Sequence, residues 1–477
     1  MVVRTDRRIE PECADGRPPD RAAPAPGRIP GVAVTTLAER GDLSRAARQF
    51  LRTESGSAVM LLSAALIALI WANVSGSYET FWHTEFSLRF GGGALTEDLR
   101  HWVNDGLMVI FFFSIGLEIS REMTIGELRG GRAIATPALA ALGGLTVPAL
   151  LYVAFNAGGP GASAWGIAIS TDTAVLLGVL ALVGPRCPDQ LRIFLLALAV
   201  VDDIGAIAAI AIFYTDHVEW TALLIAIALF VATVALRFVN FWRTPIYVLI
   251  GVLMWLSVLE SGIHPSVVGV LMGLLVNAYA PQRRDLARLQ VAGTSLLVDP
   301  TPERALAAQA AAVGTISPNE RLQLRIQPWS GYVIVPLFAL ANAGIVLDGE
   351  SLRAAATSPI TWGIVVALVV GKLLGVSAGT WVALRTGLGR VPDTLRWGQL
   401  VGGAALSGIG FTVALFVTDL AFDDQALKSQ ATIGILAGSV LAALLGWLIF
   451  RLLGERGGQC APSGLPVLPP RPWRPPA

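Results

Sequence analysis

Two adjacent carboxylates in a strongly apolar stretch are the residues best placed to do chemistry. Asp202 and Asp203 lie in LALAVVDDIGAIAAIAIFYT, residues 196–215, which contains few other polar side chains. A buried carboxylate costs free energy unless it is paired or hydrogen-bonded. Neighbouring residues of a helix point about 100° apart, so the two side chains cannot make the same contacts. Carboxylate oxygens are hard ligands suited to a small cation, and protons would compete for the same atoms.

One lysine lies in a comparable position. The chain has 35 basic residues, of which only Lys372 and Lys428 are lysines. Lys372 falls near the middle of the apolar run IVVALVVGKLLGVSAGTW, too deep for its ammonium to reach water. A charged lysine there needs a carboxylate partner, and Asp202 or Asp203 is the candidate. A purely structural ion pair would give the same pattern.

Two apolar segments carry interruptions. In AISTDTAVLLG, residues 168–178, helix-capping residue types fall in mid-span, which predicts a break near Ser170–Thr171 and a restart at Asp172 or Thr173. The glycines of VGGAALSGIGFTVALF, residues 401–416, indicate either a second break or tight helix packing. Two broken spans in corresponding halves are typical of a transporter binding site. Opposed half-helix ends would need an ion or a side chain to balance their dipoles.

The composition is that of an all-α polytopic membrane protein. The 477 residues are 54% hydrophobic and only 14% charged, against about 25% charged in soluble domains. The net charge of +1 argues against a nucleic-acid partner. Cys13, Cys187 and Cys460 are too far apart in sequence to indicate a disulfide framework or a zinc site.

About twelve apolar segments have the length of a membrane span, taking about 20 residues for each. Their limits are 57–74, 100–120, 133–156, 164–184, 190–214, 219–238, 245–260, 263–280, 330–347, 360–384, 398–421 and 428–452. Basic residues concentrate in alternate loops, and the positive-inside rule then places both termini in the cytoplasm. We expect a multi-pass protein of the bacterial inner membrane.

The segments outside the spans divide the chain. We expect disordered tails at 1–42 and 454–477, both rich in proline, around a transmembrane domain at 43–453. Residues 281–328 are expected to form a partly disordered cytoplasmic loop with a helix through PERALAAQAAAV. The outer segment TEFSLRFGGGALTEDL, residues 84–99, predicts a small β-hairpin for protein contact, with a flexible connector as the alternative.

Other ionisable residues near the ends of the spans are weaker candidates. Asp105 lies early in the second span, and His264 lies near the outer surface, where a lone histidine is usually a bystander. Three charged residues lie at the cytoplasmic end of the second span: Glu118, Arg121 and Glu122. Such residues are either functional or simply solvated.

At these positions the sequence resembles the NhaA-type Na⁺/H⁺ antiporter family over roughly residues 45–453. The resemblance depends on seven motifs in one order: WVNDGLM with FFFSIGLEISRE, STDTAVLLGVLALVG, LALAVVDDIGAIAAIAIFYT, YVLIGVLMWLSVLESGIHPSVVGV, VPLFALANAGI, GKLLG and SGIGFTVALF. It implies inverted-topology repeats, of which this family is a known example, with two discontinuous helices crossing at mid-membrane. It also implies electrogenic exchange of cytoplasmic Na⁺ or Li⁺ for external H⁺, with no cofactor.

The resemblance also implies roles for individual residues. Asp203 matches the main cation ligand, Asp202 its partner, and Lys372 the lysine that pairs with Asp202. Thr171 and Asp172 match the broken-helix residues, with Asp172 balancing the opposed dipoles.

Further roles follow for residues away from the aspartate pair. Asp105 matches an acidic residue that influences transport. The outer hairpin matches a homodimer contact. The residues that match a cytoplasmic pH-response funnel are Glu118, Arg121 and Glu122.

One segment departs from the family pattern. Where well-known members carry a charged, histidine-containing cluster involved in the pH response, this chain reads ERLQLRIQPW, residues 320–329. Arg321 is retained, but Gln323, Leu324 and Gln327 are neutral and Glu320 is acidic. Steep activation by pH is therefore not implied here.

Two other classes of protein could use buried aspartates. An intramembrane aspartyl protease would carry them on different helices with a Gly-x-Gly-Asp signature, whereas here they are adjacent. A cation channel would leave a lysine at the centre of its pore unexplained.

Overall fold

The structure is a computed structural model that describes residues 54–90, 93–125, 131–184, 189–215, 218–239, 244–391 and 395–453. The two predicted tails, 1–42 and 454–477, lie outside the described residues.

The described residues are mostly helical, with one pair of strands. In the first half of the chain the elements are α2 (Glu54–Val74), α3 (Ser77–Trp82), β1 (Glu85–Phe90), β2 (Gly93–Asp98), α4 (Leu99–His101), η1 (Trp102–Leu107), α5 (Met108–Thr124), α6 (Gly131–Asn156), η3 (Ala162–Ala168), α7 (Thr173–Val183), α8 (Asp189–Phe213), α9 (Trp220–Phe238), α10 (Thr244–Ser261) and α11 (Ser266–Leu274). In the second half they are α12 (Arg283–Val298), α13 (Pro302–Gly314), α14 (Pro318–Trp329), η4 (Ser330–Ile334), α15 (Val335–Asn342), α16 (Gly349–Thr357), α17 (Pro359–Val366), η5 (Ala367–Gly371), α18 (Lys372–Arg385), α19 (Trp397–Leu406), α20 (Thr412–Ala421) and α21 (Gln425–Leu453).

Every predicted span contains at least one helix, but not all of these helices are long enough to cross a bilayer. Among the described residues, seven helices pass by length and composition, or eight when the bent pair η3 and α7 counts as one span. α11 has 9 residues and α15 has 8, against about 20 for a full crossing. The chain is a helical membrane protein, and the number of twelve spans stays a prediction.

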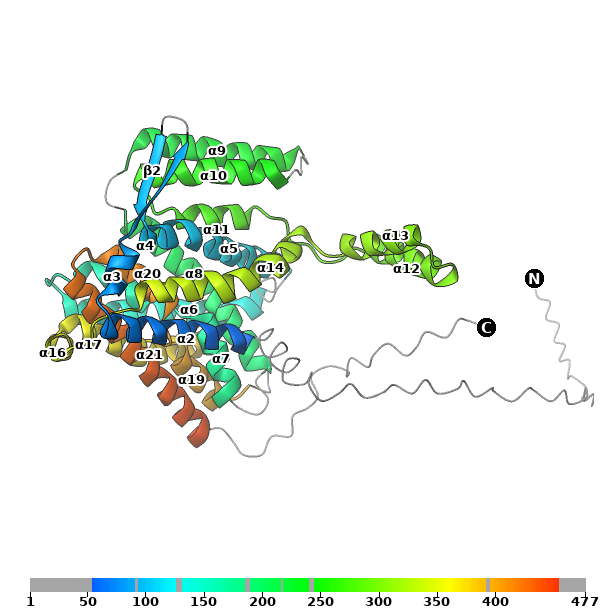
Figure 1. Cartoon of the computed structure of the whole chain (residues 1–477). Coiled ribbons are helices and arrows are strands. Elements are labelled where there is room, and N and C mark those ends of the chain that lie inside the picture. The colour runs from blue at the N-terminus through cyan, green and yellow to red at the C-terminus, as the bar shows by residue number, and fades with distance from the viewer. Residues whose placement is uncertain are drawn as a thin grey trace, which may run out of the picture. The chain divides into compact units, whose positions relative to one another are not determined.

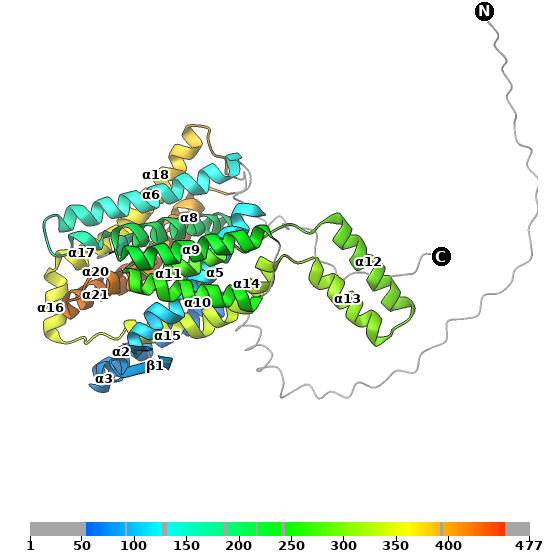
Figure 2. The same cartoon turned by 90° about the horizontal axis from the view of Figure 1, so that it is seen from above.

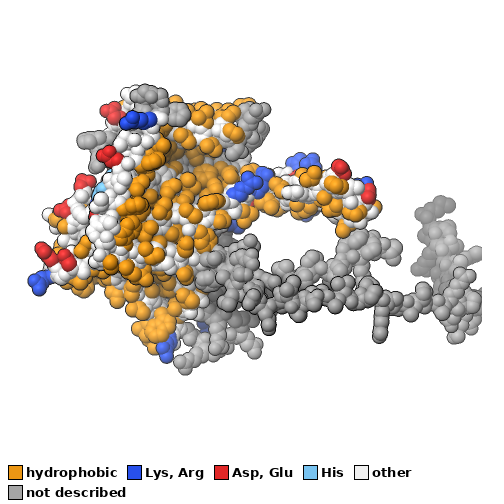
Figure 3. Space-filling model, in the orientation of Figure 1, with side chains coloured by type: hydrophobic (Ala, Val, Ile, Leu, Met, Phe, Trp, Pro, Cys, Tyr) orange, Lys and Arg blue, Asp and Glu red, His pale blue; other side chains and the backbone are white. Residues whose placement is uncertain are grey.

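Hydrophobic side chains cover the face of the molecule drawn in Figure 3, whereas charged side chains lie mainly toward the helix ends. On α2 the exposed residues include Leu66 and Ile67, and on α9 they include Leu224 and Val231. A helix that exposes such residues along its length is suited to lipid rather than to water. α9 and α10 pack against each other (Figure 1) and share a small core with α11, apart from the main core.

Glycines allow close packing of the helices around the site. α6 and α18 run side by side, as Figure 2 shows. A Cβ atom at Gly375 would collide with the carbonyl oxygen of Gly143, and one at Gly143 would collide with that of Gly375. Small residues at such contacts bring the two backbones together. This packing positions Lys372, which lies one turn before Gly375 on α18.

The segment predicted to form a β-hairpin contains a two-stranded antiparallel sheet. β1 pairs with β2 in the register Glu85↔Asp98, continuing to Phe90↔Gly93. Asp98 joins the sheet to the neighbouring helices, because one carboxylate oxygen lies 2.9 Å from His83 Nδ1 and the other 2.8 Å from His101 Nδ1.

The segment 281–328 differs from the partly disordered loop expected from the sequence, because it folds into α12, α13 and most of α14. The expected helix through PERALAAQAAAV is α13, and α12 packs on it. Thr301 and Ser317 cap α13 and α14 through their side chains, and each is followed by proline at the start of the helix. These are strong local signals for a helix start, and they outweigh the polar composition of the segment.

Replacing Gly375 with alanine tests the α6–α18 contact. The added methyl group meets backbone atoms that cannot move aside, so we expect a loss of about 1–3 kcal/mol in stability, measured as a lower thermal midpoint in detergent. Gly293→Ala in α12 is the matched control, since no atom lies within 4 Å of its Cβ position. Alanine should stabilise that helix by roughly 0.5–1 kcal/mol. Equal midpoints for the two variants would contradict the packing described here.

Candidate ion-binding site

A buried ion pair lies at the centre of the candidate site. Lys372 Nζ is 2.6 Å from Asp202 Oδ2, and neither side chain is exposed. The same ammonium donates a second hydrogen bond of 2.6 Å to the carbonyl oxygen of Ile169. Of the two partners that the sequence left open for Lys372, the structure therefore selects Asp202.

The first interrupted helix supplies a second contact to Asp202. The helical segment η3 ends at Ala168, and α7 begins at Thr173, with a bend of 45° between them. The Thr171 hydroxyl lies 2.7 Å from Asp202 Oδ2 and 2.8 Å from the carbonyl oxygen of Ser407. Its single proton can serve one of these acceptors at a time. The break thus falls at the position that the sequence predicted.

The second interrupted helix meets the first one through Asp172. α19 ends at Leu406 and α20 begins at Thr412, so the glycine-rich segment does contain a break. Asp172 caps α7 by accepting a bond from Val175 N (3.0 Å), and its other oxygen accepts one from Thr412 N (3.1 Å). Its own backbone N–H donates to Ile409 O at 2.7 Å. One carboxylate therefore faces the positive N-terminal ends of two half-helices.

Gly410 shows how closely the two interruptions approach. A Cβ atom at this position would lie 2.7 Å from the carbonyl oxygen of Ser170, which is closer than real Cβ contacts. The backbone at one helix break therefore lies directly against the backbone at the other, and glycine leaves room for both.

The adjacent residues Asp202 and Asp203 both have carboxylate oxygen atoms without a hydrogen-bond partner among the described residues. Asp202 Oδ1 is buried without a hydrogen-bond partner, although Oδ2 of the same group has two neighbours. Asp203 is partly buried and makes no hydrogen bond or ion pair with another described residue. Unpaired carboxylate oxygens on adjacent residues offer hard ligands to a small cation.

The structure brings together two candidates that the sequence treated separately. His264 Nε2 lies 3.2 Å from Asp105 Oδ1, and the other ring nitrogen lies 2.9 Å from Ser266 Oγ. The histidine ring also contacts Phe416 of α20 edge-on, with 4.8 Å between the ring centres. His264 is therefore a packed and hydrogen-bonded residue, and its partner Asp105 comes from a segment about 160 positions earlier in the chain.

The charged residues at the end of α5 meet the start of α14. Arg121 lies 3.8 Å from Glu122 and 3.9 Å from Glu320. Glu320, which departs from the family pattern, also completes the capping box of α14 with Ser317. Glu118 lies one turn before Glu122 on α5, and Arg321 follows Glu320 on α14. Arg121 therefore links the end of α5 to the start of α14.

Sequence reasoning missed the groups that hold the broken helices in place. The Tyr214 hydroxyl accepts a bond from Gly166 N (3.0 Å) and donates one to Ser163 O (2.9 Å), which fastens η3 to the end of α8. The carbonyl groups of Ile169 and Ser407, which accept bonds from Lys372 and Thr171, belong to the backbone. A pattern of side-chain types therefore could not predict them. Tyr214 was detectable only as a polar residue at the end of the aspartate-bearing span.

The chain is similar to known proteins over most of its length. The family model of Na⁺/H⁺ antiporter 1 matches residues 48–450. The chain is 50% identical over 460 residues to Na⁺/H⁺ antiporter NhaA 3 of Frankia alni, covering 95% of this chain and 98% of that protein. It is 44% identical to NhaA 1 of Mycolicibacterium vanbaalenii (90% and 70% covered) and 47% identical to NhaA 1 of Salinispora arenicola (88% and 64% covered). The chain belongs to the NhaA-type Na⁺/H⁺ antiporter family.

Proposed function

We propose that this chain is a secondary transporter that exchanges cytoplasmic Na⁺ or Li⁺ for external H⁺, and that more protons than sodium ions move in each cycle. Membership of a Na⁺/H⁺ antiporter family supports the exchange and a transporter rather than an enzyme. The observation that carries the site assignment is the fully buried Asp202–Lys372 pair at the meeting point of two interrupted helices.

The geometry suggests how a cation and a proton are coupled. A Na⁺ ion held by Asp203 and the free oxygen of Asp202 would sit beside the Lys372 ammonium. Two positive charges on one carboxylate repel each other strongly in a medium of low dielectric constant. Binding of Na⁺ therefore weakens the Asp202–Lys372 pair and favours release of a proton from the lysine. Return of protons would restore the pair and expel the cation.

The interrupted segments give the site freedom to change sides. Thr171 contacts Asp202 and the backbone of the second broken helix, and Asp172 holds the start of α20. A shift of one half-helix would thus alter the hydrogen bonds of the aspartate pair directly. In such folds, alternating access arises when one bundle rocks against another around a fixed site.

The finer arrangement is also part of the proposal. We place both termini in the cytoplasm of a bacterium, with the chain crossing the inner membrane twelve times in inverted repeats. We also propose a homodimer through β1 and β2, because Phe86 and Leu88 of β1 each expose about half of their surface. Exposed apolar residues on a short two-stranded sheet favour contact with a second chain.

The two rival classes of function fit the geometry less well. A protease dyad needs two carboxylates aimed at one water molecule, whereas Asp202 is occupied by Lys372 and Thr171. A channel needs a continuous polar path, whereas a buried ion pair closes the centre of this molecule.

Asp203→Asn tests the cation ligand. An amide cannot supply the negative charge that holds Na⁺, so Na⁺-dependent proton movement should disappear in everted vesicles loaded with an acridine dye. Asp299→Asn is the matched control, because Asp299 is exposed in the turn between α12 and α13, and its activity should stay at the wild-type level. Normal exchange by Asp203→Asn would remove this residue from the site.

Lys372→Met separates coupling from folding. Loss of the ammonium leaves Asp202 buried without its charge partner, and a proton can then neutralise it. We expect a folded protein in which the pH dependence of exchange or the proton-to-sodium ratio is altered, measured in proteoliposomes under an imposed potential. Asp202→Asn/Lys372→Met, which removes both charges, is the control for folding. A single variant that fails to fold, rescued by the double variant, would favour a purely structural ion pair.

Competition for one site predicts a defined pH dependence. Each proton that competes with a bound Na⁺ should raise the half-saturating Na⁺ concentration by up to about tenfold for each unit by which pH falls. Equilibrium binding of Na⁺ to the purified protein, followed by calorimetry over a pH series, measures this slope. An affinity that does not change with pH would overturn the shared-site mechanism.

A further inference from the structure

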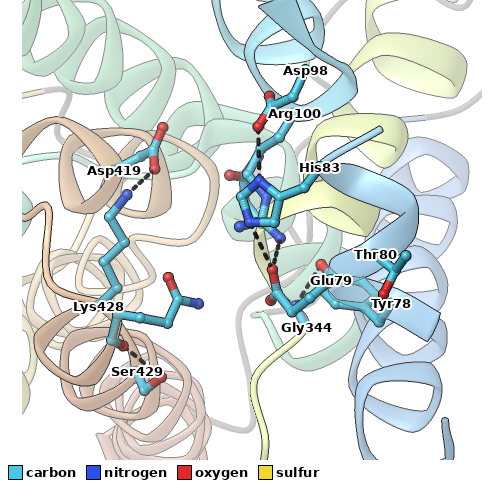
Figure 4. A network of polar contacts seen from close by, with 12 residues as sticks. Tyr78, Glu79, Thr80, His83, Asp98, Arg100, Gly344, Asp419, Lys428 and Ser429 are labelled. Atoms are coloured by element: carbon cyan, nitrogen blue, oxygen red, sulfur yellow. Dashed lines mark hydrogen bonds and ion pairs between the residues drawn. The ribbon is translucent and has the colours of Figure 1, made fainter. Parts of the chain in front are cut away.

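A second ion pair lies at the far end of α20 from the aspartate site. Asp419, two residues before the end of α20, contacts Lys428 near the start of α21 at 2.6 Å, and each side chain is 24% exposed. Figure 4 shows these two side chains reaching toward each other across the turn between the helices. No sequence motif pointed to this pair, and the site described above does not use it.

Two asparagines extend this ion pair into the protein. Asn104 of η1, which is 3% exposed, donates a hydrogen bond of 2.7 Å to Asp419 Oδ2. Asn342 at the end of α15 donates one of 2.8 Å to Asn104 Oδ1, and the return bond measures 3.2 Å. We call Asp419, Lys428, Asn104 and Asn342 the α20 lock. It joins η1 and α15 to the consecutive helices α20 and α21, which lie far from η1 in the sequence.

The lock borders a pocket that opens to the surface. Its lining includes Arg100, Asn342, Thr418, Asp419, Gln425 and Lys428. Arg100 is already engaged by Glu79 at 3.0 Å, so Lys428 is the cation in contact with Asp419. The pocket lies on the face that the proposed orientation assigns to the outside, and its polar lining differs from the apolar surface of the helices.

α20 connects the lock to the aspartate site. Thr412 N, at its first residue, is bound by Asp172, and Asp419 lies seven residues later, about 10 Å along the helix axis. Between the two, Phe416 packs against the rings of Phe112 and His264. A short, continuous helix with both ends fastened transmits a displacement from one end to the other.

The α20 lock is of intermediate strength, as expected for a contact that forms and breaks during transport. A partly exposed ion pair contributes little stability by itself, whereas the bond from buried Asn104 to the carboxylate is charge-assisted and stronger. The lock is thus firmer than an ordinary surface pair. It remains reachable by water, in contrast to the fully buried Asp202–Lys372 pair.

We propose that the α20 lock is the outer gate of the transporter. It holds α20 against α21 and η1 while the aspartate site is closed to the outside, and it separates when the site opens outward. Asp419 and Lys428 are positioning residues in this scheme: they touch no transported ion and act through α20. The proposal depends on the exchange activity and orientation proposed above.

Labelling from the outside tests the gate separately from transport. Thr418, 3% exposed, lines the pocket. We would introduce Thr418→Cys after replacing Cys13, Cys187 and Cys460 with serine, and add a membrane-impermeant maleimide to intact cells. Lys428→Gln or Asp419→Asn should raise the labelling rate by about tenfold, the factor that corresponds to losing about 1.4 kcal/mol. Asp348→Asn, at an exposed helix cap, is the control and should leave the rate unchanged.

A conservative variant adds a readout that a general loss of packing would not give. Lys428→Arg keeps the positive charge beside Asp419 and leaves the bond from Asn104 in place, so labelling should stay slow and the half-saturating Na⁺ concentration should approach the wild-type value. Unchanged labelling in both Lys428→Gln and Asp419→Asn, or labelling of Lys428→Arg as rapid as that of Lys428→Gln, would overturn the gate. A wild-type chain without Na⁺/H⁺ exchange would instead remove the proposed function, and the labelling rates would still decide whether the lock exists.

Discussion

The Lys372 ammonium and the Asp202 carboxylate meet at 2.6 Å with neither side chain exposed to solvent. Removing two full charges from water costs several kcal/mol for each ion, and their attraction offsets this only with good geometry and further hydrogen bonds. The carbonyl oxygen of Ile169 and the hydroxyl of Thr171 supply those bonds. Both come from the segment between η3 and α7, so the ion pair and the helix break depend on each other.

The same dependence extends to the second broken helix. Interrupting a helix inside a membrane leaves backbone groups without partners, and a bilayer offers none. The Asp172 carboxylate accepts hydrogen bonds from backbone N–H groups at the starts of two helices, α7 and α20. The backbone N–H of Asp172 donates to the carbonyl oxygen of Ile409. The backbone that is exposed by one break is thus satisfied largely by the other.

Glycine packing and polar anchors set the limits of such a shift. The close contact between α6 and α18 fixes the helix that carries Lys372, and Tyr214 fixes η3 against the end of α8. α20 lies between the aspartate site and the lock formed by Asp419 with Lys428. The fold therefore combines rigid helices around the ion pair with one short helix whose two ends are held by polar contacts.

The amino-acid sequence by itself determined the membrane class, the apolar segments and the first helix break, and it singled out Asp202, Asp203 and Lys372 as candidate site residues. These follow from local physics, since a charge in an apolar run and a capping residue in mid-span are visible without a partner. Only the tertiary structure decided that Lys372 pairs with Asp202, that Asp105 meets His264, and that Asp419 joins Asn104 and Lys428. It also showed helices in the segment 281–328, where polar composition concealed the capping signals. Pairings between distant residues depend on how helices pack, and the order of residues along one helix does not encode that packing.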